Sequence, residues 1–254
     1  MTATARSTED LPGAADRRVR AAILAAGLVT AGLTAPAGAQ VSVEVALQTD
    51  FRVRGHSVSD GQPAASLSLA YDDPSGAYLG AAAIGTVRGG EPALLGVQAN
   101  LGYAARLGPS VSIDGGVAKT QYFQGYGTRR DYDHTELYLG LSLPVASARL
   151  SYSPDYYRNG ADTLYAEFDT GIEPAPGWLL SAHAGMLSYL DTPPFYTPRR
   201  TFDWRIGATR QFGPWGLHLD LSGRVQGRAH YAVPGGAGSG RDPAAAVLGL
   251  TRAL

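Results

Sequence analysis

Short segments in which apolar and polar residues alternate recur along this chain, and they constrain its fold more than any other feature. Over residues 41–54 the odd positions are mainly apolar and the even positions are mainly polar or charged. Side chains of a β-strand point alternately to its two faces, so this segment has one apolar face and one polar face. A helix would scatter the same residues around its axis. The pattern therefore predicts a strand.

Twelve such segments follow one another, and the connections between them differ at the two ends. The predicted strands cover residues 41–54, 63–72, 77–87, 95–107, 111–123, 133–143, 148–155, 162–172, 178–189, 201–212, 217–225 and 244–254. In the fourth segment, Leu95 and Val97 belong to the predicted apolar face. Connections after even-numbered strands are tight turns rich in Gly and Pro, whereas 56–62, 124–132, 191–200 and 226–243 are longer. Short turns at one end and long loops at the other are typical of outer-membrane barrels.

The N-terminal residues carry the three parts of a secretion signal. Arg17, Arg18 and Arg20 form a basic region, residues 21–33 are apolar, and Ala37-Gly38-Ala39 is a small-x-small cleavage site. The apolar run is shorter than the roughly 20 residues that a membrane-spanning helix needs. The sequence predicts a cleaved leader over 1–39, followed by one domain over 40–254 that is located in the outer membrane of a Gram-negative bacterium.

Composition narrows the remaining classes. The chain has 21 basic and 22 acidic residues, a near balance that argues against a nucleic-acid partner. It contains no cysteine, which excludes disulfides and thiolate metal sites. A mean hydropathy of -0.09 is compatible with a membrane barrel, because only half of each strand is apolar.

These observations predict an all-β fold, an up-and-down antiparallel transmembrane β-barrel of about twelve strands. A soluble barrel has the same period but turns its apolar face inward. The leader, the asymmetry of the connections and the aromatic residues near strand ends favour the membrane barrel. These aromatic residues are Tyr71, Tyr78, Phe123, Trp178, Tyr189 and Phe212.

Charged residues within the strands are the candidate functional residues. An Arg that faced lipid at the bilayer midplane would cost about 2–4 kcal/mol, so these side chains are expected to line the lumen. The expected lumen-lining residues are Glu44, Asp50, Arg52, Arg54, Arg106, Glu136, Arg149, Glu167, Asp169, Asp203, Arg205, Asp220 and Arg224. With Asp114 and Asp155, the acids outnumber the bases, which predicts a narrow lumen with a weak preference for cations. The constriction is expected to include the charges of the first strand.

Two groups of residues could suggest chemistry, and both have simpler explanations. His134 and Glu136 share one face of a strand, where lumen-lining polar residues are expected. His56, Ser57, Ser59 and Asp60 lie close together in the chain, as in a hydrolase triad, but Ser, Asp and Gly are also ordinary turn residues. We therefore expect no catalytic set, no metal and no cofactor.

Residues 49–64, which include Arg54-Gly55 and Pro63-Ala64, resemble the opening motif of the TorF-type porin family of proteobacterial outer membranes. Shorter similar pieces follow at 75–80, 132–136 and 152–156, so the resemblance spans nearly the whole mature chain. The chain departs from the motif at Val53, where an aromatic residue is usual, and at Leu254, where these barrels usually end in Phe. The resemblance implies an outer-membrane barrel and a porin function.

Three classes of function remain open from the sequence. The first is a porin for passive diffusion of small hydrophilic solutes or ions. The second is a structural or adhesion barrel whose lumen is filled by side chains, and the third is an outer-membrane hydrolase. The expected partners are outer-membrane lipid and lipopolysaccharide, the barrel-assembly machinery and small solutes, without nucleic acid; the sequence leaves the oligomeric state open.

Overall fold

The computed structural model describes residues 39–123, 132–158, 160–191, 198–226 and 244–254. The leader predicted over 1–39 lies outside these residues except for Ala39. Most of each of the longer connections predicted at 124–132, 191–200 and 226–243 also lies outside them. In the described part of the chain, no helix is long and apolar enough to cross a membrane.

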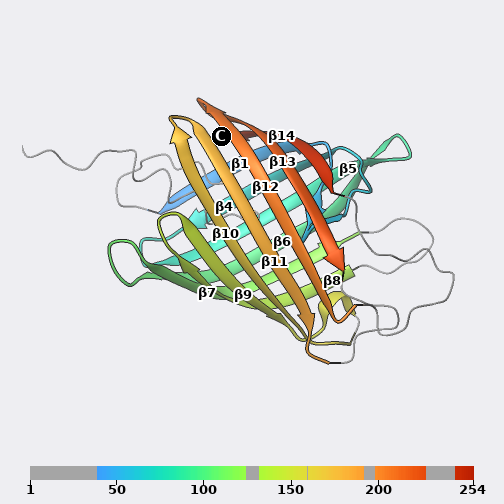
Figure 1. The fold of residues 1–254 in the computed structure, drawn as a ribbon, viewed down its shortest axis with the longest axis horizontal. Coiled ribbons are helices and arrows are strands. Elements are labelled where there is room, and N and C mark those ends of the chain that lie inside the picture. Colours follow the sequence, from blue (N-terminus) through green and yellow to red (C-terminus); the bar gives the residue numbers. More distant parts are fainter. Residues whose placement is uncertain (1–38, 124–131, 159, 192–197, 227–243) are drawn as a thin grey trace, which may run out of the picture.

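Among the described residues, twelve antiparallel strands close into one barrel in the order β1-β14-β13-β12-β11-β10-β9-β8-β7-β6-β5-β4 (Figure 1). The barrel strands are β1 (Gln40–Gln48), β4 (Ala64–Asp72), β5 (Ala77–Arg88), β6 (Glu91–Arg106), β7 (Ser112–Tyr122), β8 (Tyr132–Ser142), β9 (Ala146–Ser153), β10 (Thr163–Ala175), β11 (Trp178–Tyr189), β12 (Arg200–Phe212), β13 (Trp215–Gln226) and β14 (Ala245–Ala253). The remaining elements are two short strands, β2 (Arg52–Val53) and β3 (His56–Ser57), and the 3-10 turn η1 (Tyr156–Arg158). The predicted fold class is confirmed.

The barrel closes between its first and last strands. Pairing of β1 with β14 runs from Glu44 opposite Ala253 to Gln48 opposite Gly249. The other edge of β1 pairs with β4 over its whole length. Closure leaves no sheet edge, so the backbone groups of each strand find partners without water.

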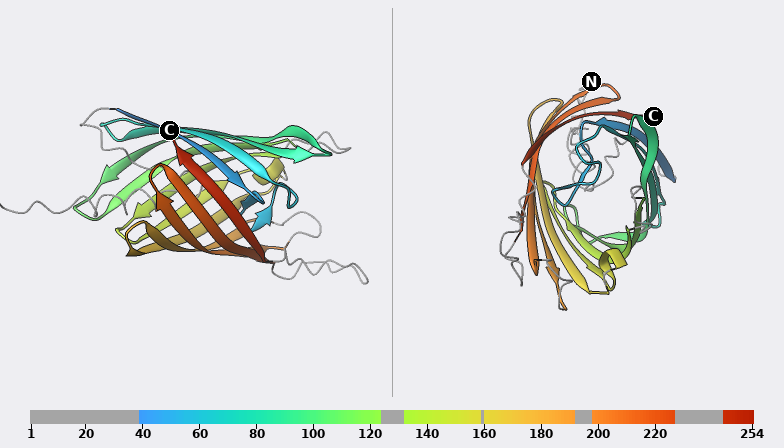
Figure 2. Two further views of the ribbon diagram at one scale, coloured as in Figure 1. Left: turned by 90° about the horizontal axis from the view of Figure 1, so that it is seen from above. Right: turned by 90° about the vertical axis from the view of Figure 1, so that its right-hand side faces the viewer.

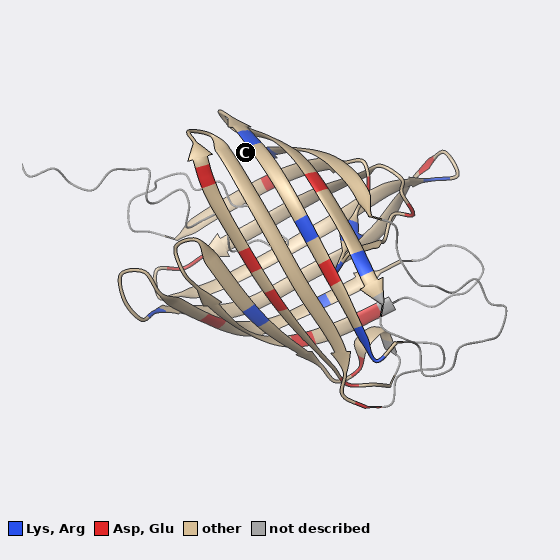
Figure 3. Cartoon of the chain, in the orientation of Figure 1, with Lys and Arg blue, Asp and Glu red and all other residues tan. Residues whose placement is uncertain are grey.

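The strands turn their apolar residues outward and their polar residues inward. Leu47, Leu139 and Ile206 are 53%, 63% and 60% exposed, whereas Asp114 and Asp203 are buried inside the barrel. Figure 3 shows that charged positions occur along the strands and not only at their ends. This polarity is the reverse of that of a soluble barrel, and it is the one that a lipid-facing wall requires.

A β-bulge reverses the predicted facing of Leu95. In the pairing of β5 with β6, Ile84 lies opposite Gly96 and Gly85 lies opposite Leu94, so Leu95 is an extra residue. The extra residue shifts the alternation by one position. Leu95 is therefore fully buried inside the barrel, whereas Leu94 and Val97 are exposed on the outside.

The aromatic residues near strand ends divide between the two faces. Tyr71, Trp178 and Phe212 are exposed on the outer face, as an aromatic girdle at the membrane surface requires. Tyr189 is buried in an interior cluster instead, and the hydroxyl of Tyr78 donates to Asp114 inside the barrel. The prediction of a girdle is wrong for these two residues.

Cysteine labelling tests the orientation of the barrel. Gln62 and Ser110 are both exposed, Gln62 just before β4 and Ser110 in the tight turn between β6 and β7 at the other end. With long loops outward, a Cys at Gln62 should react with an impermeant thiol reagent on whole cells, whereas a Cys at Ser110 should react only after lysis. The chain has no native Cys, so the background is low. Labelling only at Ser110 would reverse the orientation.

Candidate functional site

The chain between β1 and β4 folds into the barrel as a small hairpin. Strand β1 ends at Gln48, where Thr49 bonds Leu248 of β14 through both its backbone N–H and its hydroxyl. The hairpin, which comprises residues 49–63, then pairs β2 with β3, with Arg52 opposite Ser57 and Val53 opposite His56. Seen along the barrel in Figure 2, this blue segment lies within the ring of strands.

The hairpin corrects two predictions. The first strand was predicted to continue to residue 54, but Asp50, Arg52 and Arg54 belong to the hairpin and not to the barrel wall. The alternation of apolar and polar residues continues past Gln48 because β2 is also a strand, with extended backbone. Residues 56–62 were predicted as an external loop, but Val58 and Ser59 are buried in the folded-in segment.

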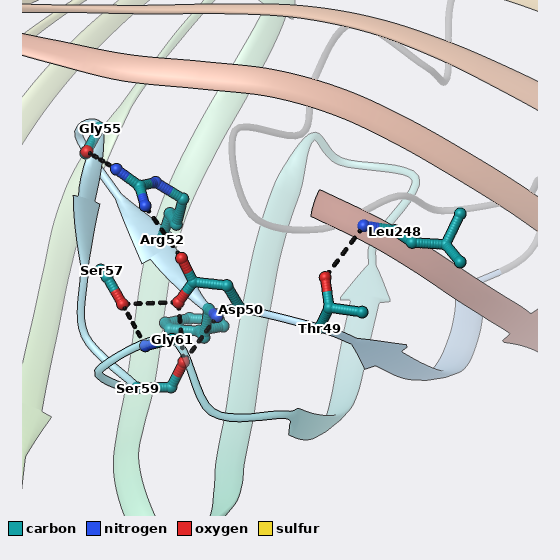
Figure 4. A network of polar contacts seen from close by, with 9 residues as sticks. Thr49, Asp50, Arg52, Gly55, Ser57, Ser59, Gly61 and Leu248 are labelled. Atoms are coloured by element: carbon teal, nitrogen blue, oxygen red, sulfur yellow. Dashed lines mark hydrogen bonds and ion pairs between the residues drawn. The ribbon is translucent and has the colours of Figure 1, made fainter. Parts of the chain in front are cut away.

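Asp50 holds the base of the hairpin together (Figure 4). Its carboxylate accepts hydrogen bonds from Ser57 at 2.5 Å, from Ser59 at 3.0 Å and from Arg52 at 2.9 Å. Arg52 also donates to the backbone oxygen of Gly55 at 2.6 Å. Burial alone would raise the pKa of Asp50, but the bonds from Ser57, Arg52 and Ser59 outweigh it and hold the pKa below its ordinary value.

The same contacts explain the hydrolase-like group of residues in this segment. The hydroxyl of Ser57 donates to Asp50 and accepts the N–H of Gly61. The hydroxyl of Ser59 donates to Asp50 and accepts the N–H of Phe51. Both serines are therefore engaged in holding the turn.

Arg54 at the hairpin tip reaches the opposite wall of the barrel. Its Nη2 donates to Oε1 of Glu136 on β8 at 2.7 Å. Its guanidinium carbon lies 3.9 Å from the ring centre of Tyr165 on β10 and 5.3 Å from that of Tyr156. A cation over tyrosine faces in a partly desolvated place is worth about 1–2 kcal/mol. This salt bridge and these ring contacts fix the tip across the lumen.

The tip turn also depends on Gly55. Arg54 and Gly55 both have positive φ (49° and 70°), as the two central residues of a type I′ hairpin turn must. A Cβ on Gly55 would lie 2.5 Å from the backbone oxygen of Gly223 and 2.9 Å from Cβ of Asp203. The tip therefore packs directly on β12 and β13.

Apolar side chains inside the barrel form a seat for the hairpin. Val58 packs with Ile84, Leu95 and Tyr122 of the wall, and Phe51 and Val53 pack against the same cluster. The apolar residues of this cluster interrupt the polar lining of the inner wall where the hairpin contacts it. The bulge that turns Leu95 inward thus provides part of this seat.

A second segment folds inward beside the tip. In η1, Tyr156 is buried, and both Tyr156 and Tyr157 lie 4.8 Å from the ring of His134, centre to centre. These two tyrosines were not among the interior residues predicted from the sequence. An adjacent Tyr pair in a Pro-, Asp- and Gly-containing connection was the available signal.

The inward charges of the wall are largely paired. Besides Arg54–Glu136, Arg149 lies 3.4 Å from Asp114, and Arg205 lies 3.8 Å from Asp169. The ring nitrogens of His183 lie 2.9 Å from Asp169 and 3.0 Å from Asp203. His134 lies 3.7 Å from Glu136, so the two residues that shared a predicted face do meet.

Some predicted site residues have no such partner. Among the described residues, Glu44, Glu167, Asp220 and Arg224 make no ion pair, although all four are partly buried. Arg106 is exposed at the end of β6, and Asp155 is exposed before η1.

Ligand atoms of Glu167, Asp169 and His183 lie within 4.8 Å of one another, close enough to share a cation. Both ring nitrogens of His183 already contact carboxylates of Asp169 and Asp203. His183 is therefore satisfied within a hydrogen-bonded network of the wall that includes Asp169 and Asp203.

Comparison with known proteins places the chain in a family. A family model described as "Bacterial protein of unknown function (Gcw_chp)" matches residues 32–222, which is most of the chain, and the protein belongs to this family. No curated protein matches the sequence.

Solved structures share the fold at low sequence identity. The NanC porin has a TM-score of 0.52 and 9% identity, over 84% of this chain and 98% of that one. The KdgM porin has a TM-score of 0.50 and 10% identity, over 83% and 98%. The fold is thus one that outer-membrane porins also adopt.

Two glycine variants test the docking of the hairpin tip. Gly55 and Gly61 have nearly equal φ (70° and 71°), but only Gly55 has atoms within reach of an added Cβ. Either change to Ala should cost roughly 1–2 kcal/mol of left-handed strain. We expect Gly55→Ala to lower the free energy of unfolding by about a further 1–3 kcal/mol through overpacking. Equal decreases in the free energy of unfolding of the two variants, measured by urea titration, would contradict this docking.

The acid dependence of stability tests the role of Asp50. Because its folded pKa lies below the ordinary value of about 3.9, its stabilising contribution is complete at neutral pH and disappears as the pH falls through the folded pKa. We expect Asp50→Asn to lower the thermal midpoint by several degrees at about pH 7, with a smaller difference from wild type at about pH 3. Asp60→Asn, on the exposed side of the hairpin, is the control and should change little at either pH.

Proposed function

We propose that this protein is a passive outer-membrane channel for small hydrophilic solutes or ions, narrowed by the inward hairpin. The observation that carries the proposal is the distribution of polarity, with buried charged side chains inside a closed barrel and large apolar side chains exposed outside. An interior with this many ionisable groups is costly unless water or partners reach them. A water-containing lumen meets that need.

The same surface supports the proposed location and partners. An apolar outer wall with aromatic residues at its rim suits a lipid bilayer. The predicted leader supports secretion across the inner membrane, with cleavage after Ala39. Outer-membrane lipid, lipopolysaccharide and the assembly machinery are therefore the proposed partners. The TorF-type resemblance supports this proposal, since its most specific stretch, 49–64, contains the hairpin.

The charges that lack partners favour cations. Within the described residues, Glu44, Glu167 and Asp220 are inward acids without an ion pair, against Arg224 among the inward bases. Paired charges largely cancel for a passing ion, so the unpaired ones dominate. We propose a weak cation preference on this basis.

A barrel with a filled lumen is the second candidate. It is favoured by the apolar packing of Phe51, Val53 and Val58 against the inner wall. A hydrolase has less support, because Ser57 and Ser59 donate to Asp50 and the ring of His134 packs against Tyr156 and Tyr157.

Single-channel recording separates these candidates. Arg54→Ala removes the Glu136 salt bridge and the ring contacts of the tip, so we expect a larger or more variable conductance than in wild type. Arg210→Ala is the matched control, because Arg210 donates to Pro176 and lies over Trp178 at the barrel rim. In a salt gradient, the reversal potential of the wild type should indicate a small cation preference.

The conductance of a variant without the hairpin distinguishes an open barrel from a filled one. A variant that replaces residues 51–61 with a short Gly-Ser linker should conduct more than Arg54→Ala. Absence of conductance in the folded deletion variant would favour the structural barrel instead.

A further inference from the structure

A cavity of about 320 Å³ lies against the hairpin inside the barrel. Its wall includes four tyrosines, Tyr122, Tyr156, Tyr157 and Tyr189, and two arginines, Arg54 and Arg224. The rest of the lining is three aliphatic side chains, a threonine and His56. Although acids are abundant in this lumen, the described residues that line the cavity include no Asp or Glu.

Arg224 leaves a positive charge available in this cavity. Arg54 is compensated by Glu136 at 2.7 Å. Arg224, on β13, makes no hydrogen bond or ion pair with the described part of the chain. Arg54 also retains an unused donor, because its Nη1 is buried without a hydrogen-bond partner. A negatively charged hydrogen-bond acceptor in the cavity would pair with Arg224 and would accept from Nη1 of Arg54.

The tyrosines make the wall rigid and aromatic. Tyr122, Tyr156 and Tyr189 are each at most 6% exposed, so their rings are held in place by packing. Such rings bind the face or edge of another planar ring in offset or edge-to-face contacts. The volume is at the lower end of the range for ligand pockets, which limits the occupant to about one ring.

We propose that this cavity binds a small organic anion that carries a carboxylate on a flat ring. Arg224 pairs with the carboxylate, since a guanidinium matches its two oxygens. The tyrosines contact the ring, and the aliphatic side chains close the remaining surface. The site lies against the hairpin, and binding there does not require that the lumen conducts.

Titration calorimetry with the refolded full barrel in detergent micelles tests the proposal, with benzoate as the probe and micelles alone as the blank. Benzoate should bind wild type at least tenfold more tightly than benzamide, which has the ring without the charge, and than acetate, which has the charge without the ring. Equal binding of benzamide would mean that the cavity is an apolar void, and would overturn the proposal.

Variants locate the binding. Arg224→Gln should weaken benzoate binding about tenfold or more, and Arg224→Lys should restore part of it. Arg205→Gln, which removes a partly exposed Arg of the neighbouring strand outside the cavity, should bind as wild type does. Unchanged binding in Arg224→Gln would overturn the assignment. If benzoate binds but the barrel does not conduct, the proposed channel is refuted and this site stands. If the barrel conducts but benzoate does not bind, this site is refuted and the proposed channel stands.

Discussion

Hydrogen bonding of the backbone without water is the constraint on which the rest of this structure depends. A sheet in lipid cannot have a free edge, so β1 must pair with both β4 and β14. Closure then assigns every residue of a strand either to lipid or to the enclosed interior. The apolar face goes outward, and the charged face is enclosed with whatever partners the opposite wall supplies. The ion pairs inside the barrel are thus a consequence of closure, which gives the backbone groups at both sheet edges their hydrogen-bond partners.

The hairpin of residues 49–63 resolves part of that enclosed charge. Arg54 crosses the lumen to Glu136, which on the wall alone would be a buried acid near His134. Leaving one partner of such a pair alone would cost several kcal/mol, because the remaining charge would be desolvated without compensation. The apolar seat formed by Ile84, Leu95 and Tyr122 holds the rest of the hairpin. The same segment therefore narrows the lumen and neutralises part of the charge on its wall.

Much of this fold could be predicted from the period of the sequence, and its exceptions have local causes. Strand β11 was predicted at its observed bounds, and most others within three residues, since a one-residue slip would turn a whole face to the wrong side. The predicted facing or bounds were wrong where an alternating segment is not a regular strand of the barrel wall. Residues 50–54 alternate like a barrel strand, yet they lead into a hairpin turn in which Arg54 and Gly55 both have positive φ. Of these two residues only Gly favours that conformation, so the sequence signal for the turn is weak. Leu95 faces inward because of a bulge, which depends on its pairing with β5.

Contacts across the barrel lay beyond prediction because they depend on closure and register together. Arg54 and Glu136 are 82 positions apart in the sequence, so their contact leaves no local pattern in the chain. For the same reason, a count of inward acids and bases describes the lumen poorly. Most of the opposite charges that the sequence assigned to the lumen neutralise each other, so local excesses decide what an ion encounters. Beside the hairpin that excess is positive at Arg224, while Glu44, Glu167 and Asp220 make it negative elsewhere on the inner wall. A lumen arranged in this way can hold an anion at one point and still favour cations along its length.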